Sequence, residues 1–180
     1  MAQSGKGLAA LGLIVALIGA SAAGFLLIKQ YILVPPAPEP YIRPMARVYQ
    51  SGTYYLLSGA TTTFNYTDKS YDTHDAFDLG SDTYEIPEPG FYQVIAQYCI
   101  EAEFQDFFKI DIARNGITMS SRSFTAARST NTFTASIVDI INATSGDLIS
   151  IRVYSYNGPD DPRLVFAYED YTFFTIMKEP

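Results

Sequence analysis

The sequence predicts an all-β protein, an antiparallel jelly-roll sandwich preceded by one N-terminal transmembrane α-helix. Residues 46–180 contain many short runs rich in Tyr, Phe, Thr and Ile, which favour β-strands. Gly, Pro and Asn separate these runs, and no helical periodicity interrupts them. Many short strands without helices are typical of a sandwich or jelly roll. Residues 8–28, by contrast, form a continuous apolar block.

The chain has 180 residues, which fit one domain plus appendages. Its net charge of −7 argues against a nucleic-acid partner, because phosphate binding needs clustered Lys and Arg. Cys99 is the one cysteine, so no intrachain disulfide can form. We expect a buried, inert thiol in a strand, with an intermolecular bridge as the alternative.

The N-terminal block follows a short tail at residues 1–7, and we assign residues 8–33 to an anchor helix. Residues 8–28 carry no charge and are long enough to cross a hydrocarbon core of ~30 Å. The lipid membrane is therefore the predicted partner of this segment. Small residues recur at intervals of four and form a strip suited to close helix packing: Gly12, Ala16, Ala20 and Gly24.

Three interpretations of this block stay open. It can be an uncleaved signal anchor that leaves the C-terminal domain outside the cell. It can be a cleaved secretory signal, because Ala20-Ser21-Ala22 satisfies the small-residue cleavage rule, although the apolar run continues to Ile28. Alternatively, Gly5-Lys6-Gly7 before the apolar run resembles the processing site of archaeal pilins and archaellins, and such a resemblance implies a helix that packs into a filament core.

Residues 34–45 form a proline-rich linker. Its five prolines exclude a regular helix or a sheet ladder and favour an extended polyproline-like spacer. At roughly 3 Å per residue, the spacer would hold a head domain, residues 46–180, some ~30 Å from the membrane surface.

The head is organised around a proline–glycine turn at residues 87–90. After Gly90 apolar and polar residues alternate with period two, and both faces of this predicted strand carry bulky side chains. Asn115-Gly116 is the strongest hairpin signal. Residues 68–75 read as a polar, acidic loop. The predicted strands are Ala46–Gln50, Thr53–Leu57, Thr61–Tyr66, Asp82–Ile86, Gly90–Ala102, Phe107–Arg114, Ile117–Phe124, Asn131–Ile141, Asp147–Tyr156 and Tyr168–Met177.

The order of these motifs resembles the complement-1q and tumour-necrosis-factor-like jelly-roll family over about residues 46–178. Tyr84–Tyr92 is similar to that family's entry to its long central strand. The turn Ser145-Gly146-Asp147 between two apolar strands and the closing run Tyr171–Met177 are similar to its later motifs. The chain departs from the family in lacking a collagen-like segment before the head.

The resemblance implies a homotrimer in which the outer face of one sheet packs on its neighbours. The aromatic content agrees with this expectation, because it exceeds what one core of this size normally hides. The aromatic residues that we expect to divide between core and interface are Tyr54, Tyr55, Tyr92, Tyr98, Phe107, Phe108, Tyr154, Tyr156, Phe173 and Phe174.

No catalytic constellation is evident, because the single histidine, His74, lies in the acidic loop without a nucleophile motif. The acidic loops predict candidate calcium ligands at Asp72, Asp75, Asp160 and Asp161, since calcium needs several oxygen ligands and members of the resembled family often bind it. A solvated acidic surface is the alternative. Two sequons predict glycosylation at Asn65 and Asn142.

The sequence thus predicts a non-catalytic, membrane-anchored surface protein. It presents a trimeric jelly-roll head for binding, adhesion or assembly, toward an extracellular ligand or assembly partner. The head would lie on a cell envelope or a virion surface. The alternative is a structural subunit of an extracellular pilus-like filament, or of the capsid or spike of a membrane-containing virion.

Overall fold

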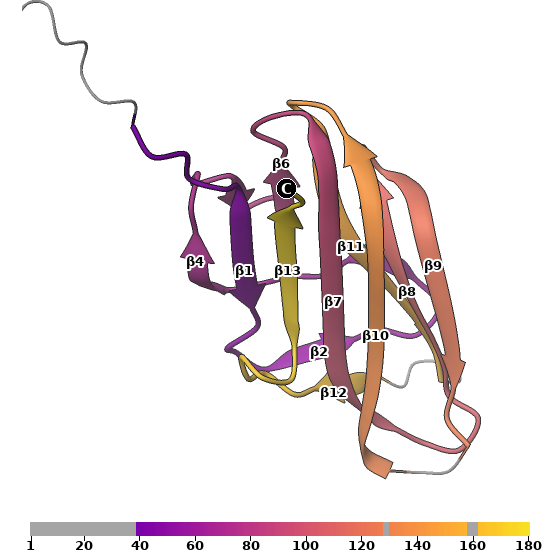
Figure 1. Ribbon diagram of the computed structural model, residues 1–180. Helices are drawn as coiled ribbons and strands as arrows, with labels where there is room; N and C mark the ends of the chain where they lie inside the picture. The colour runs from indigo at the N-terminus through magenta and orange to yellow at the C-terminus, as the bar shows by residue number, and fades with distance from the viewer. Residues whose placement is uncertain (1–38, 128–129, 158–161) are drawn as a thin grey trace, which may run out of the picture. The chain divides into compact units, whose positions relative to one another are not determined.

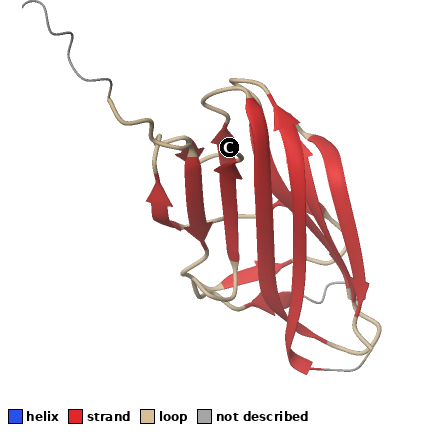
Figure 2. Cartoon of the chain, in the orientation of Figure 1, coloured by secondary structure: helices blue, strands red, loops and turns tan. Residues whose placement is uncertain are grey.

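The computed structural model describes residues 39–127, 130–157 and 162–180. The chain divides into two compact units, and the unit Ile42–Pro180 is the head. Its described residues form strands and loops, without helices (Figure 2). No helix long and apolar enough to cross a bilayer occurs in the described part of the chain. The anchor helix predicted at 8–33 lies outside the described residues.

Two sheets build the head, and all pairings between their strands are antiparallel. Sheet A contains β1 (Met45–Tyr49), β2 (Tyr54–Leu56), β4 (Asp68–Asp72), β7 (Gly90–Ala102), β10 (Thr130–Ala143), β12 (Arg163–Val165) and β13 (Phe173–Lys178). Sheet B contains β3 (Thr61–Thr63), β5 (Phe77–Asp78), β6 (Thr83–Glu85), β8 (Phe107–Arg114), β9 (Ile117–Thr125) and β11 (Leu148–Tyr156). The predicted antiparallel sandwich is confirmed.

In sheet A the strand order is β2-β12-β7-β13-β1-β4 (Figure 1). Strand β10 is off this path and pairs with β7 along its whole length, from Gly90 to Ala102. In sheet B the order is β5-β6-β11-β8-β9, and β3 pairs with β11. Strands distant in sequence are therefore neighbours, as in β1 beside β13. The first and last strands of the head thus pair with each other in one sheet.

The predicted central strand, β7, has the bounds that its sequence pattern indicates. Tyr92, Val94, Ala96 and Tyr98 point into the sandwich and are at most 1% exposed. The alternate residues point away from the core, since successive side chains of a strand face opposite sides. Both Tyr92 and Tyr98 thus belong to the core of their own chain, and only the other face of β7 is available to a partner.

The Asn115-Gly116 turn joins β8 and β9, as predicted. Both residues have a positive φ, 51° and 77°, which is the backbone of a type I′ hairpin turn. The Asn115 side chain also fastens the neighbouring turn, because its Nδ2 donates to Asp147 Oδ1 at 2.7 Å and its Oδ1 accepts from the Leu148 N–H at 2.8 Å. Two loops at this end of the sandwich are therefore tied together.

The structure differs from our element predictions at several places, and the strand predicted at Thr61–Tyr66 ends at Thr63. The acidic loop at 68–75 contains β4, which lacks apolar alternation but pairs with β1, with Arg47 opposite Tyr71. Strands β5 and β12 were not predicted, because their few residues are ordered by pairing, β5 with β6 and β12 with β2 and β7. The last strand begins at Phe173 and not at Tyr168, since Tyr168 accepts the N–H groups of Tyr171 and Thr172 in a tight turn.

Candidate binding surfaces

The outer face of sheet A is an apolar surface. We use this name for the outward side chains of β7, β10 and β13: Phe91, Gln93, Ile95, Gln97, Ser136, Val138, Ile140, Phe173, Thr175 and Met177. Strand register sets Val138 beside Ile95, and Ile140 beside Gln93. Val138 and Ile140 are 60% and 55% exposed, which is high for aliphatic side chains in the middle of a strand.

A polar border runs along β1, next to this apolar surface. The Arg47 guanidinium lies 4.0 Å from the centre of the Phe173 ring, and its Nη2 donates to the Glu169 carbonyl at 3.0 Å. Its Nη1 also contacts the Thr175 hydroxyl at 3.3 Å. An apolar centre with a charged, hydrogen-bonded rim is the usual composition of a protein interface.

The aromatic residues divide between core and surface as follows. Four of those that the sequence analysis singled out fill the core: Tyr92, Tyr98, Phe108 and Phe174. Four are half-buried: Tyr54, Phe107, Tyr154 and Phe173. Tyr55 and Tyr156 are exposed. The aromatic excess is therefore spread over both sheets and is not confined to the outer face of sheet A.

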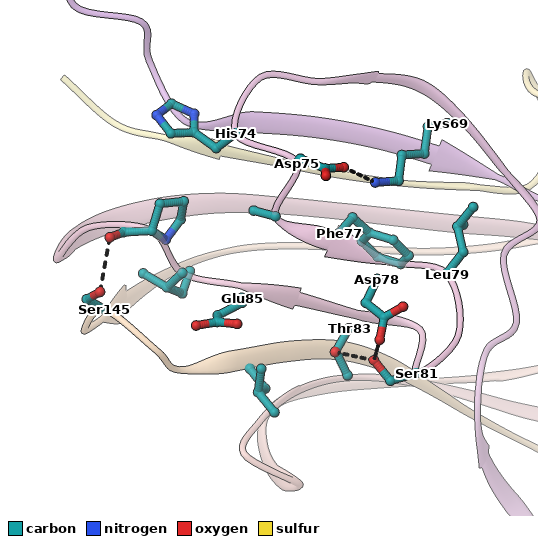
Figure 3. Close-up of a pocket in the computed structure, with 14 residues that line it drawn as sticks. Lys69, His74, Asp75, Phe77, Asp78, Leu79, Ser81, Thr83, Glu85 and Ser145 are labelled. Carbon is teal, nitrogen blue, oxygen red and sulfur yellow. Dashed lines mark hydrogen bonds and ion pairs between the residues drawn. The ribbon is translucent and has the colours of Figure 1, made fainter.

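A groove of about 820 Å³ lies at the β5–β6 edge of sheet B (Figure 3). One wall comes from the β4–β5 loop with His74 and Asp75. The strands β5 and β6 contribute Asp78 and Glu85, and on the other side the β10–β11 turn contributes Ser145 and β11 contributes Leu148. Two stretches that are distant in sequence, residues 69–87 and 145–148, thus form one concave surface.

Most charged groups of the groove are already engaged. Lys69 Nζ lies 3.0 Å from Asp72 Oδ2 and 3.1 Å from Asp75 Oδ1. The Asp78 carboxylate accepts the Gly80 N–H and the Ser81 hydroxyl, each at 2.8 Å, and these hydrogen bonds lower the pKa of Asp78. The Glu85 carboxylate is exposed and has no hydrogen bond or ion pair within the described ranges.

Asp72 has a structural role at the base of the β4–β5 loop. Its carboxylate accepts the backbone N–H groups of Ala76 at 3.0 Å and Phe77 at 2.9 Å. Burial raises the pKa of Asp72, but these donors and the Lys69 ammonium outweigh burial, so the pKa lies below its ordinary value. Asp72 thus holds the loop that forms one wall of the groove.

The predicted calcium ligands are only partly described. Asp72 and Asp75 lie together, but the Lys69 ammonium sits between their carboxylates. Asp160 and Asp161 lie outside the described residues. Among the residues that are described, no group of three or more His, Cys, Asp or Glu side chains is placed to hold a metal ion. Calcium binding stays a prediction.

The two sequon asparagines differ in their surroundings. Asn65 is half-buried, and its Nδ2 donates to Asp82 Oδ2 at 3.3 Å while its Oδ1 accepts from Gln50 Nε2 at 3.3 Å. Asn142 is exposed near the end of β10. Glycosylation at either position stays a prediction, and Asn142 is the more accessible of the two.

His74 and Cys99 occupy different environments. His74 is exposed on the rim of the groove, with its Nδ1 2.9 Å from the Thr73 hydroxyl. Cys99 is 4% exposed and unbridged, and burial raises the pKa of its thiol. The expectation of a buried thiol is confirmed.

The sandwich, with its long central strand and its Gly-Asp turn, defines a complement-1q/tumour-necrosis-factor-like jelly roll. Solved structures agree with this fold. The globular domain of zebrafish complement 1qA aligns over 77% of this chain and 98% of its own, at 17% identity and a TM-score of 0.59. Murine APRIL at pH 5.0 aligns over 77% of this chain and 100% of its own, at 11% identity and a TM-score of 0.59.

A third similar structure is Eiger TNF from S. frugiperda, which aligns over 78% of this chain and 94% of its own. Its identity is 10% and its TM-score 0.59. No protein-family model and no characterised protein sequence matches the chain. The predicted resemblance to this fold is therefore confirmed by three-dimensional structure.

No motif in the sequence predicts the groove. Glu85 and Leu148 lie 63 positions apart in the chain, yet they are opposite each other in the β6–β11 pair. One local signal was present: successive side chains of a strand face opposite sides, so an inward Tyr84 predicts an outward Glu85. No sequence signal indicates that the β10–β11 turn lies beside it.

Proposed function

We propose that this chain is a membrane-anchored surface protein whose head forms a homotrimer and binds a partner outside the cell without catalysis. The observation that carries the proposal is the apolar outer face of sheet A, with Val138 and Ile140 more than half exposed in one chain. Exposed aliphatic side chains that neighbour each other on the face of a sheet favour burial in an interface.

The fold favours a second copy of the same chain as the partner that covers the outer face of sheet A. The chain has the jelly roll of complement-1q and tumour-necrosis-factor domains, and closed symmetric assembly is the commonest way for a soluble domain to cover such a face. The polar border formed by Arg47 and Glu169 supplies the rim that such an interface needs. A closed ring would also cover strand edges.

The membrane part of the proposal is supported by sequence. Residues 8–28 are uncharged and long enough to span a bilayer, and prolines separate them from the head. A head at the end of a stiff spacer suits contact with a ligand away from the membrane surface.

The test is the mass and form of the native protein. The full chain, extracted in a nonionic detergent, should elute as a discrete particle whose protein mass by light scattering equals three chains. Electron microscopy of the same material should show separate heads. A single-chain mass would overturn the trimer, whereas fibres or shells that form without detergent would replace display by the filament or virion-subunit alternative.

A further inference from the structure

Glu85 is an acidic side chain that the fold leaves unused. It lies on β6 in the middle of the residues that line the groove (Figure 3). Its carboxylate is exposed and has no partner in the described part of the chain, whereas Asp75 is engaged by Lys69 and Asp78 by the Gly80 N–H. The groove therefore has more negative than positive charge, and one carboxylate is free to accept a donor.

Apolar surface adjoins this carboxylate. Leu148 is the cross-strand neighbour of Glu85 and is 41% exposed. Leu79 and Pro87 also line the groove, whereas the Ile86 side chain is only 1% exposed. A ligand that suits both parts of the groove has an aliphatic stem and a cationic end.

We propose that this groove binds a lysine or arginine side chain of a partner polypeptide. Such side chains pack their methylene stems on apolar surface and present the charged end to polar groups. The stem would lie along Leu148 and Pro87, and the ammonium or guanidinium would reach Glu85 and Asp78. An anionic ligand would meet the carboxylates, and so the charge of the groove excludes it.

The inference rests on the proposed binding function and gives the chemistry of its partner. It does not depend on the trimer, because every residue that lines the groove comes from one chain. The groove and the outer face of sheet A lie on different sheets.

The test is a titration of the full chain in nonionic detergent, labelled with ¹³C at the methyl groups of Ile and Leu. The probe is N-acetyl-lysine methylamide, and its Nε-acetylated form is the uncharged control. We expect saturable shifts at the methyl signals of Leu79 and Leu148, with little change at Leu57. The acetylated probe should bind at least about two- to fivefold more weakly, because it lacks the positive charge.

Glu85→Gln tests the free carboxylate and should weaken the lysine probe about two- to fivefold. Glu101→Gln removes the same charge from an exposed residue outside the groove and should leave binding unchanged. Equal weakening by both variants, equal binding of both probes, or shifts spread over the whole surface would overturn the inference.

Light scattering of the same sample separates the two proposals. A trimer without groove shifts overturns only this inference, and a monomer with groove shifts overturns only the trimer.

Discussion

The guanidinium of Arg163 and the carboxylate of Asp106 form a buried ion pair with two contacts. Arg163 Nε lies 2.7 Å from Asp106 Oδ2, and Nη2 lies 3.3 Å from Oδ1. The side chains are 7% and 6% exposed. The pair joins the first residue of β12 to the β7–β8 turn, where the Glu103 N–H also donates to Asp106 Oδ2 at 2.8 Å.

Asp106→Ala should lower the free energy of unfolding by about 3–5 kcal/mol, because it leaves the Arg163 charge buried without its main carboxylate. Urea unfolding followed by circular dichroism measures this change. Glu103→Gln is the matched control: Glu103 contacts the same guanidinium at 3.2 Å but is 67% exposed, so its loss should cost less than about 1 kcal/mol. If the two variants lowered the free energy of unfolding equally, Asp106 would not be the main partner of the Arg163 charge.

Gly116→Ala should destabilise the head by about 1 kcal/mol, because an alanine at φ 77° is strained. No atom lies within 4 Å of the added Cβ, so the effect comes from the backbone conformation alone. Gly52→Ala is the control, since its Cβ would only meet Gln50 Oε1 at an ordinary 3.8 Å. Thermal unfolding of both variants compares them, and an unchanged melting temperature for Gly116→Ala would rule out the type I′ turn.

Acid should destabilise the head partly through Asp72, whose side chain is 4% exposed. Its folded-state pKa lies below that of the unfolded chain because hydrogen bonds and Lys69 outweigh burial. The stabilisation is therefore present above the ordinary aspartate pKa of about 4 and is lost as pH falls through the folded-state value.

Urea unfolding between neutral pH and about pH 2 measures this dependence. We expect a shallower decline on acidification for Asp72→Asn than for the wild type, from a lower starting stability at neutral pH. Glu101→Gln controls for the loss of one negative charge. If Asp72→Asn kept the full wild-type acid decline, Asp72 would have no part in it.

Charges introduced on the outer face of sheet A should dissociate the proposed trimer. Ile140→Glu buries a carboxylate in the interface without a partner, so the mass by light scattering should fall to that of one chain. Leu57→Glu changes an exposed aliphatic residue away from this face, 63% exposed in the loop after β2, and should leave the mass unchanged. A trimer that survives Ile140→Glu together with Val138→Glu would place the interface elsewhere.

Cys99 should react with thiol reagents only after the head unfolds. Burial in the strand excludes the reagent and raises the pKa of the thiol, which keeps it protonated. Ellman's reagent added to the native chain should label little, and the same reagent in denaturant should label one thiol per chain. A dimer on a non-reducing gel of freshly prepared native protein would instead indicate the intermolecular bridge.

Local patterns predicted the parts of the fold that depend on neighbouring residues. Alternation after Gly90 predicted β7 with its bounds, and Asn115-Gly116 predicted the hairpin, because both signals arise from backbone and side-chain preferences within a few positions. Their order along the chain was enough to indicate the complement-1q/tumour-necrosis-factor-like jelly roll.

Sequence patterns alone predict the β-sandwich of the head, the central strand, the buried Cys99 and the bulky side chains on both faces of β7. The strand β4, the contact of Asp106 with Arg163 and the pairing of Glu85 with Leu148 become visible only in three dimensions. The physical reason is that these features depend on pairings between segments far apart in the chain. Strand register fixes such pairings, and no local periodicity records them.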